Sequence, residues 1–144
     1  MRDFDPEAPM PLSTQDALIH LMVIAASSDA KLSEREIGAI AGLILRSPVF
    51  DGFDRSSMNQ VAEEAIDLVK DSSDIERVLD MVLGAIPERL HDTVYALAVE
   101  ITTVDLRLEQ EELRLLEMIR EKLGLDGLMS AAIEASARVR LRRA

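Results

Sequence analysis

Apolar residues recur along this chain at intervals of three and four positions, the spacing that places them on one face of an α-helix. In the first such segment Leu18, Leu21, Met22 and Ala25 fall at i, i+3, i+4 and i+7, which predicts a helix with a single apolar stripe. Seven segments have this periodicity, and we expect helices over about 14–28, 34–47, 56–70, 75–82, 87–104, 109–123 and 127–141.

Residues that begin or end helices stand at the boundaries of these segments. Ser33 is followed three positions later by Glu36, the spacing of a capping box, and Asp126 precedes the seventh segment. Pro87 stands where a first-turn proline is tolerated, so we expect the fifth helix to begin there. Gly124 is placed to close the sixth helix. The sequence therefore predicts an all-α, compact single-domain bundle of about seven helices.

The two ends of the chain differ from its body. Residues 1–13 hold three of the five prolines and no helical periodicity, so we expect a mobile N-terminal arm ahead of a helical domain at 14–144. The last seven residues carry four arginines, or +4, against −15 on the preceding 137, which sum to the net −11. Such arginines either complement the negative end of the last helix or form a basic docking tail.

Composition narrows the classes of function. A net charge of −11 argues against a general affinity for nucleic acid or anionic membranes. The absence of cysteine excludes disulfides, thiolate metal sites and cysteine nucleophiles, and favours a cytoplasmic location. No stretch approaches the roughly 18 apolar residues of a membrane-spanning helix, and the features of a signal peptide are missing. We expect a cytoplasmic protein without direct membrane insertion.

A shift of 76 residues aligns segment 16–46 with segment 92–122, with six identities over 31 positions. Agreement is clearest in the loop, which reads SSDAKLSEREI in the first copy and TVDLRLEQEEL in the second. Each copy has an Asp, a basic residue two positions later, a Leu three later and a Glu seven later. The Asp can accept backbone hydrogen bonds, the Leu can fill the elbow, and the Glu lies in the next helix's first turn. This pattern predicts a helix–elbow–helix hairpin that is used twice.

With these two elbows, the chain resembles the tellurite-resistance TerB family, and is also similar to the N-terminal segment of the co-chaperone DjlA. The resemblance covers about 14–125 and rests on LIHLMVIAASSDAKLSEREIGAIAGLI, repeated as LAVEITTVDLRLEQEELRLLEMI. It implies a compact, all-helical, pseudo-twofold cytoplasmic protein associated with tellurite or other chemical stress. It also implies that the protein acts within protein assemblies and binds a divalent metal through acids of the elbows.

Four acidic residues of the elbows are candidate ligands for a divalent cation: Asp29, Glu36, Asp105 and Glu112. Hard cations such as Ca²⁺ prefer several oxygen ligands, and the repeat could bring two acidic elbows together. Helix capping explains the same four residues without a ligand. An EF-hand is excluded by register, because position six would be Glu34 and position twelve Ile40.

The two histidines are the other candidate metal ligands. Glu88 and His91 match the Glu-x-x-His spacing of di-iron bundles, but only one copy of that motif exists, so we expect a solvated His91. His20 lies four residues after Asp16, and we expect it to be half-buried and bonded to that carboxylate. Phe50 and Phe53 are either a plug on the core, which we favour, or an exposed hook for a partner.

Phosphate loops, nucleophile elbows and metalloprotease helices are missing from the sequence, and we expect no enzymatic activity. Our hypothesis is a non-catalytic module that binds a protein partner or a divalent cation through its acidic elbows. Two alternatives stay open. One is a small metal-dependent enzyme that uses His20, His91 and carboxylates, and the other is an ion-free regulatory domain similar to the co-chaperone segment.

Overall fold

A computed structural model describes residues 12–26, 32–103 and 110–144. Within these ranges it contains seven α-helices, three short 3₁₀ helices and no strand, which confirms the all-α prediction. The α-helices are α1 (Thr14–Ala26), α2 (Glu34–Arg46), α3 (Met58–Asp71), α4 (Ile75–Gly84), α5 (His91–Thr102), α6 (Gln110–Leu123) and α7 (Gly127–Arg140). The 3₁₀ helices are η1 (Pro48–Phe50), η2 (Arg55–Ser57) and η3 (Glu88–Leu90). Residues 1–11 of the expected N-terminal arm lie outside the described ranges.

Most helix ends follow the capping residues in the sequence. The Ser33 hydroxyl accepts a hydrogen bond from the Glu36 backbone N–H at 3.1 Å, and the Glu36 carboxylate accepts one from the Ser33 N–H at 3.0 Å. The Asp126 carboxylate caps α7 through the Leu128 N–H at 2.8 Å. Gly124 ends α6 with a φ of 64°, a left-handed conformation that favours glycine.

The predicted start of the fifth helix is wrong. Pro87 has an extended ψ of 147°, so it stands outside the helix, and the three residues that follow it form the 3₁₀ turn η3. The Leu90 N–H donates to the Pro87 carbonyl at 2.9 Å, which closes this tighter turn. Helix α5 therefore begins at His91. Similarly, η2 delays the start of α3 to Met58.

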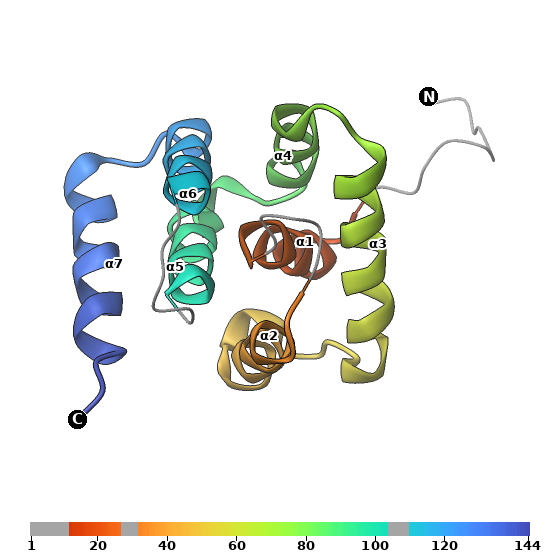
Figure 1. Ribbon diagram of the computed structural model, residues 1–144, viewed down its shortest axis with the longest axis horizontal. Helices are drawn as coiled ribbons and strands as arrows, with labels where there is room; N and C mark the ends of the chain where they lie inside the picture. Colours follow the sequence, from red (N-terminus) through yellow and green to blue (C-terminus); the bar gives the residue numbers. More distant parts are fainter. Residues whose placement is uncertain (1–11, 27–31, 104–109) are drawn as a thin grey trace.

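Helix α1 lies at the centre of the bundle, with α2 and α4 on two sides of it and α3 and α5 on the other two (Figure 1). It contacts all of these helices and α6. The prediction of a single apolar stripe is therefore wrong, because every residue from Ala17 to Ala26 is buried. Neighbours on all sides leave no face of this part of the helix for water.

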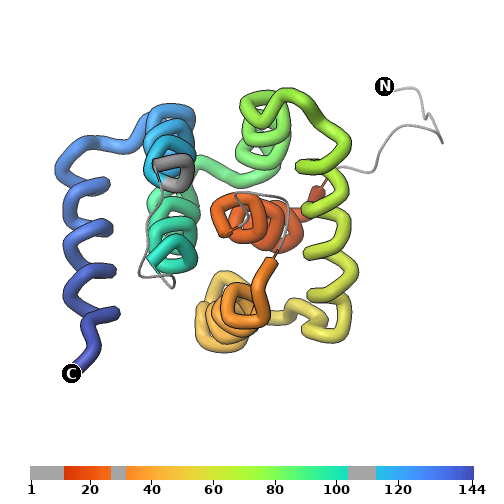
Figure 2. The backbone as a smooth tube through the Cα atoms, in the orientation of Figure 1, coloured from red at the N-terminus to blue at the C-terminus, as the bar shows by residue number. Residues whose placement is uncertain are grey.

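Helix α5 forms the second half of the core. It packs against α1 on one side and against α7 on the other, with α6 beside it (Figure 2). Helices α3 and α7 thus lie at opposite edges of the molecule. The Phe50 and Phe53 rings meet edge to face at 6.1 Å, with Phe50 buried, which confirms the plug interpretation.

Burial repeats between the two predicted hairpins. Equivalent pairs are buried in both copies: Leu21/Leu97, Val23/Val99, Ile40/Leu116 and Leu43/Ile119. The periodicity of the sequence predicts that Ile37 and Leu113, which are also equivalent in the repeat, face the core. This prediction is wrong in both copies, since they are 38% and 50% exposed. Ile37 instead faces a groove beside α3. The agreement at both buried and exposed positions supports the repeat.

Three more apolar residues that the periodicity placed on helix stripes are exposed. Leu45 sits beside buried Ile44 but is itself 64% exposed, because only a narrow face of α2 meets the core. Leu128 and Met129 of α7 are exposed because this outermost helix packs only through its inner face, on which Ser130 and Ala137 are buried. None of the described helices is long and apolar enough to cross a membrane.

Candidate functional site

The elbow acids are only partly within the described structure. Asp29 and Asp105 lie outside it, as does the side chain of Glu112. The Glu36 side chain is described, and its carboxylate completes the capping box at Ser33. Glu36 therefore caps a helix, which is the role expected from the sequence as the alternative to cation binding. The joint cation site of the four acids stays a prediction.

The histidines have separate local environments. His20 is 1% exposed, and its Nδ1 donates to the backbone carbonyl of Asp16 at 2.8 Å. The expected half-burial and carboxylate bond are therefore wrong, because a helical side chain reaches the carbonyl four residues earlier while α1 is enclosed on all sides. His91 is the first residue of α5 and is half-buried. Within the described residues, no group of three His, Asp or Glu side chains could hold a metal ion.

A groove runs between α2 and α3, next to the first elbow. Its volume is about 310 Å³. Leu32, the leucine of that elbow, lines it together with Ile37 and Ile40 from α2, while Met58, Ala62 and Ile66 line it from α3. The α3 residues are spaced by four, so they share one helix face. Glu63 is the only charged side chain among the described residues of the lining.

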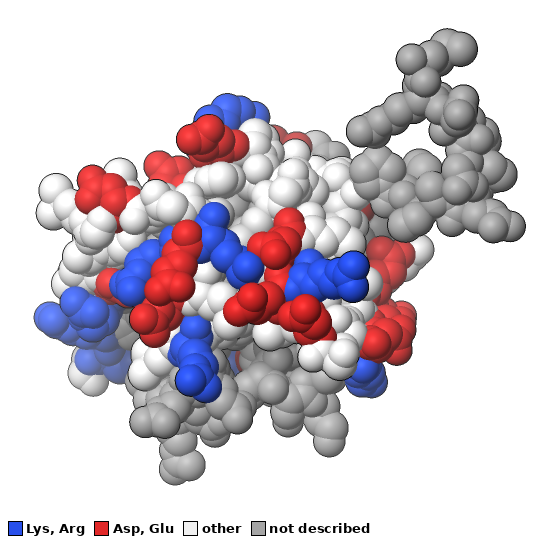
Figure 3. Space-filling model, turned by 90° about the horizontal axis from the view of Figure 1, so that it is seen from above, with Lys and Arg blue, Asp and Glu red and all other residues white. Residues whose placement is uncertain are grey.

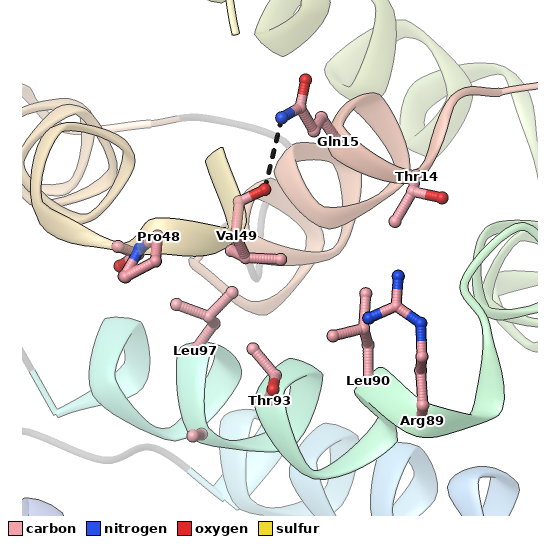
Figure 4. Close-up of a pocket in the computed structure, with 10 residues that line it drawn as sticks. Thr14, Gln15, Pro48, Val49, Arg89, Leu90, Thr93 and Leu97 are labelled. Carbon is pink, nitrogen blue, oxygen red and sulfur yellow. Dashed lines mark hydrogen bonds between the residues drawn. The ribbon is translucent and has the colours of Figure 1, made fainter. Parts of the chain in front are cut away.

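A larger cavity, of about 680 Å³, opens where three segments far apart in the sequence meet. The first turn of α1 forms one wall, η1 forms another, and η3 with the start of α5 forms the third (Figure 4). The Gln15 amide donates to the backbone carbonyls of Val49 at 3.2 Å and Asp51 at 3.0 Å. These bonds fix η1 against α1, so the shape of the cavity is set by the fold.

Two polar clusters hold α7 against α5. The buried Tyr95 hydroxyl donates to the Glu134 carboxylate at 2.9 Å. The pKa of Tyr95 is raised to about 12. Burial is the largest cause, and the hydrogen bond to Glu134 and the negative charge of Glu134 add to it. At the C-terminal end of α7, Glu100 accepts a hydrogen bond from Arg140 at 2.6 Å and lies 3.8 Å from Arg46. Arg140 of the basic C-terminus is therefore an anchor of the bundle.

Acidic and basic side chains alternate across the face of the molecule in Figure 3, without a continuous patch of one sign. The ion pair between Lys122 and Asp80, at 2.7 Å, joins α6 to α4 in this way. The hydrogen bond that Lys122 donates to the Asp80 carboxylate, together with nearby negative charge, raises the pKa of Lys122. Some of the 27 acidic side chains are thus paired locally with basic ones, while the net charge stays −11.

Sequence reasoning missed the groove, the large cavity and the contacts of α7. Each depends on residues that only the tertiary structure brings together. Tyr95 offered one signal, because a single tyrosine inside an apolar stripe needs a partner for its hydroxyl.

Comparison with known proteins gives one result that covers most of the chain. A family model described as tellurite resistance protein TerB matches residues 15–135. Searches of curated proteins and of solved structures returned no significant match. The matched region begins in the first turn of α1, includes both elbows and ends within α7. The chain therefore belongs to the TerB family, as the repeated elbow indicated.

Proposed function

We propose that this TerB-family chain is a non-catalytic, tellurite-resistance-type module that binds a protein partner through the groove between α2 and α3. The observation that carries the proposal is the combination of apolar walls with a single acidic side chain in a groove beside the first elbow. Ile37 leaves 38% of its surface exposed there although it belongs to an apolar stripe. Covering such a surface with a partner removes it from water.

The chemistry of the groove defines its occupant. Two helices form the walls, and apolar side chains from both face the space between them, which suits the apolar face of a third helix. Glu63 and the net charge of −11 favour a partner helix that carries lysine or arginine beside its apolar residues. The partner is thus an amphipathic, basic helix from another protein. Attraction between the acidic chain and the basic helix raises the association rate, and burial of apolar surface supplies most of the affinity.

Site-specific photo-crosslinking in the native host tests the proposal. Asn59 lines the groove and is exposed, so a benzophenone amino acid placed there should give a discrete adduct with one protein. Met81 of α4 is 48% exposed but lies outside the groove, and the same amino acid there serves as the control. The Asn59 adduct should disappear when Ile37→Lys is added. Equal adducts from both positions, no adduct from Asn59, or an adduct that survives Ile37→Lys would each refute the groove as the binding surface.

A further inference from the structure

We propose that the cavity between the start of α1, η1 and the start of α5 binds a small organic anion, made of a hydrocarbon body and one carboxylate. This site is separate from the partner groove, because the two share none of their described lining residues. Its volume of about 680 Å³ lies within the 300–1,000 Å³ usual for small-molecule sites.

Arg89 is the reason to expect an anion. It is the only charged residue among the described residues that line the cavity, and Figure 4 shows its side chain extending from η3 toward Thr14. Arg89 is exposed, and it makes no hydrogen bond or ion pair with any of the residues that the structure describes. Arg140, by contrast, is paired with Glu100. A guanidinium offers a planar fork of donors that matches a carboxylate.

The walls are the reason to expect an organic ligand. Val49, Leu90 and Leu97 contribute apolar side chains around the space beside Arg89 (Figure 4). An inorganic oxyanion would satisfy the guanidinium but would leave these walls in contact with water. A hydrocarbon chain attached to the carboxylate covers them and gains apolar burial.

The rigidity of the cavity also favours binding. The two hydrogen bonds of the Gln15 amide hold η1 in place, and the Phe50 side chain next to it is buried in the core. A ligand that enters the cavity therefore finds the walls from α1 and η1 already in place, so little of its interaction energy is lost in ordering that part of the backbone.

Titrations followed by backbone amide NMR test this site with octanoate as the probe, below its micelle concentration. Octanoate should shift resonances of residues 14–15, 48–49 and 89–97 in a saturable manner. Two control ligands should each bind at least about tenfold more weakly than octanoate. Octan-1-ol has the hydrocarbon chain without the charge, and inorganic phosphate has the charge without the chain. Equal binding of the alcohol would overturn the role of Arg89. Equal binding of phosphate would overturn the organic ligand.

Two variants separate binding from folding. Arg89→Gln should weaken octanoate binding at least about tenfold, while Arg77→Gln, at an exposed arginine of α4 outside the cavity, should leave it unchanged. Ala96→Phe should place a ring inside the cavity and weaken octanoate binding, with a spectrum that otherwise shows a folded protein. Wild-type affinity in Arg89→Gln, or shifts that map to another region, would refute the proposal.

Discussion

The hydrogen bond between Tyr95 and Glu134 makes a measurable contribution to stability that Tyr95→Phe isolates. The ring is 1% exposed, and its hydroxyl lies 2.9 Å from the carboxylate of α7. Phenylalanine keeps the ring packing and removes only the donor. A hydrogen bond to a charged acceptor contributes about 1.5–3 kcal/mol, and the lower part of that range applies because half-buried Glu134 regains water. We expect a loss of about 1.5–2 kcal/mol in the free energy of unfolding.

Urea unfolding at pH 7, followed by far-ultraviolet circular dichroism, measures this loss. The melting temperature should fall by about 3–8 °C in parallel. Glu134→Gln is the matched control, because it keeps an acceptor but removes the charge and should cost less than Tyr95→Phe. The double variant should be little less stable than Tyr95→Phe alone, since both changes act on one bond. A loss below about 0.5 kcal/mol, or fully additive losses, would refute the structural role of the bond.

Three other predictions concern the pH dependence, the C-terminus and the elbows. The pKa of Tyr95 is about 12 in the folded chain and 10.0 in the unfolded one. The protonated hydroxyl therefore stabilises the fold fully below pH 10, and this stabilisation is lost as the pH rises from 10 to 12. The free energy of unfolding should fall by about 1–2 kcal/mol over that range, a figure reduced to allow for the solvent near Glu134. Urea unfolding should show a shallower decline over that range for Tyr95→Phe, and identical slopes would contradict the shift. Glu100→Gln should lower the free energy of unfolding by about 0.5–1 kcal/mol and speed amide hydrogen exchange in the last turn of α7. Unchanged exchange would show that Arg140 does not anchor the helix. Calorimetric titration with Ca²⁺, Mg²⁺, Mn²⁺ and Zn²⁺ should give heat of binding, and the double variant Asp29→Ala with Asp105→Ala should lose it. Heat no larger than that of dilution in the unchanged protein would refute cation binding by the elbows.

The helices could be predicted from the sequence because periodicity and capping act over a few residues. Ser33, Asp126 and Gly124 mark helix ends by bonds or φ values that depend on local structure alone. Burial depends on neighbours, which explains the errors at Ile37 and in α1. The segment from Ala17 to Ala26 is apolar except for His20, and this near-continuous run was a signal of a helix buried on every side.

The candidate sites were less predictable because distant segments build them. The large cavity joins positions near 14, 48 and 90, and nothing local to Arg89 reveals that it lines a cavity with apolar walls. Leu32 was expected to fill the elbow, and the groove that it lines could not be predicted because the other wall comes from α3. Family membership could be recognised because the elbow is a local motif that occurs twice.

The affinity of the purified chain for the protein recovered by crosslinking at Asn59 is the most direct test of the proposed function. Ile37→Lys places a charge in the groove, while Leu128→Lys makes the same change on the exposed face of α7, where the wild-type leucine is 79% exposed. Calorimetry should show binding weakened at least about tenfold by Ile37→Lys and unchanged by Leu128→Lys, with both variants folded. The opposite result, with affinity lost in Leu128→Lys and retained in Ile37→Lys, would move the partner surface to α7 and contradict the proposal.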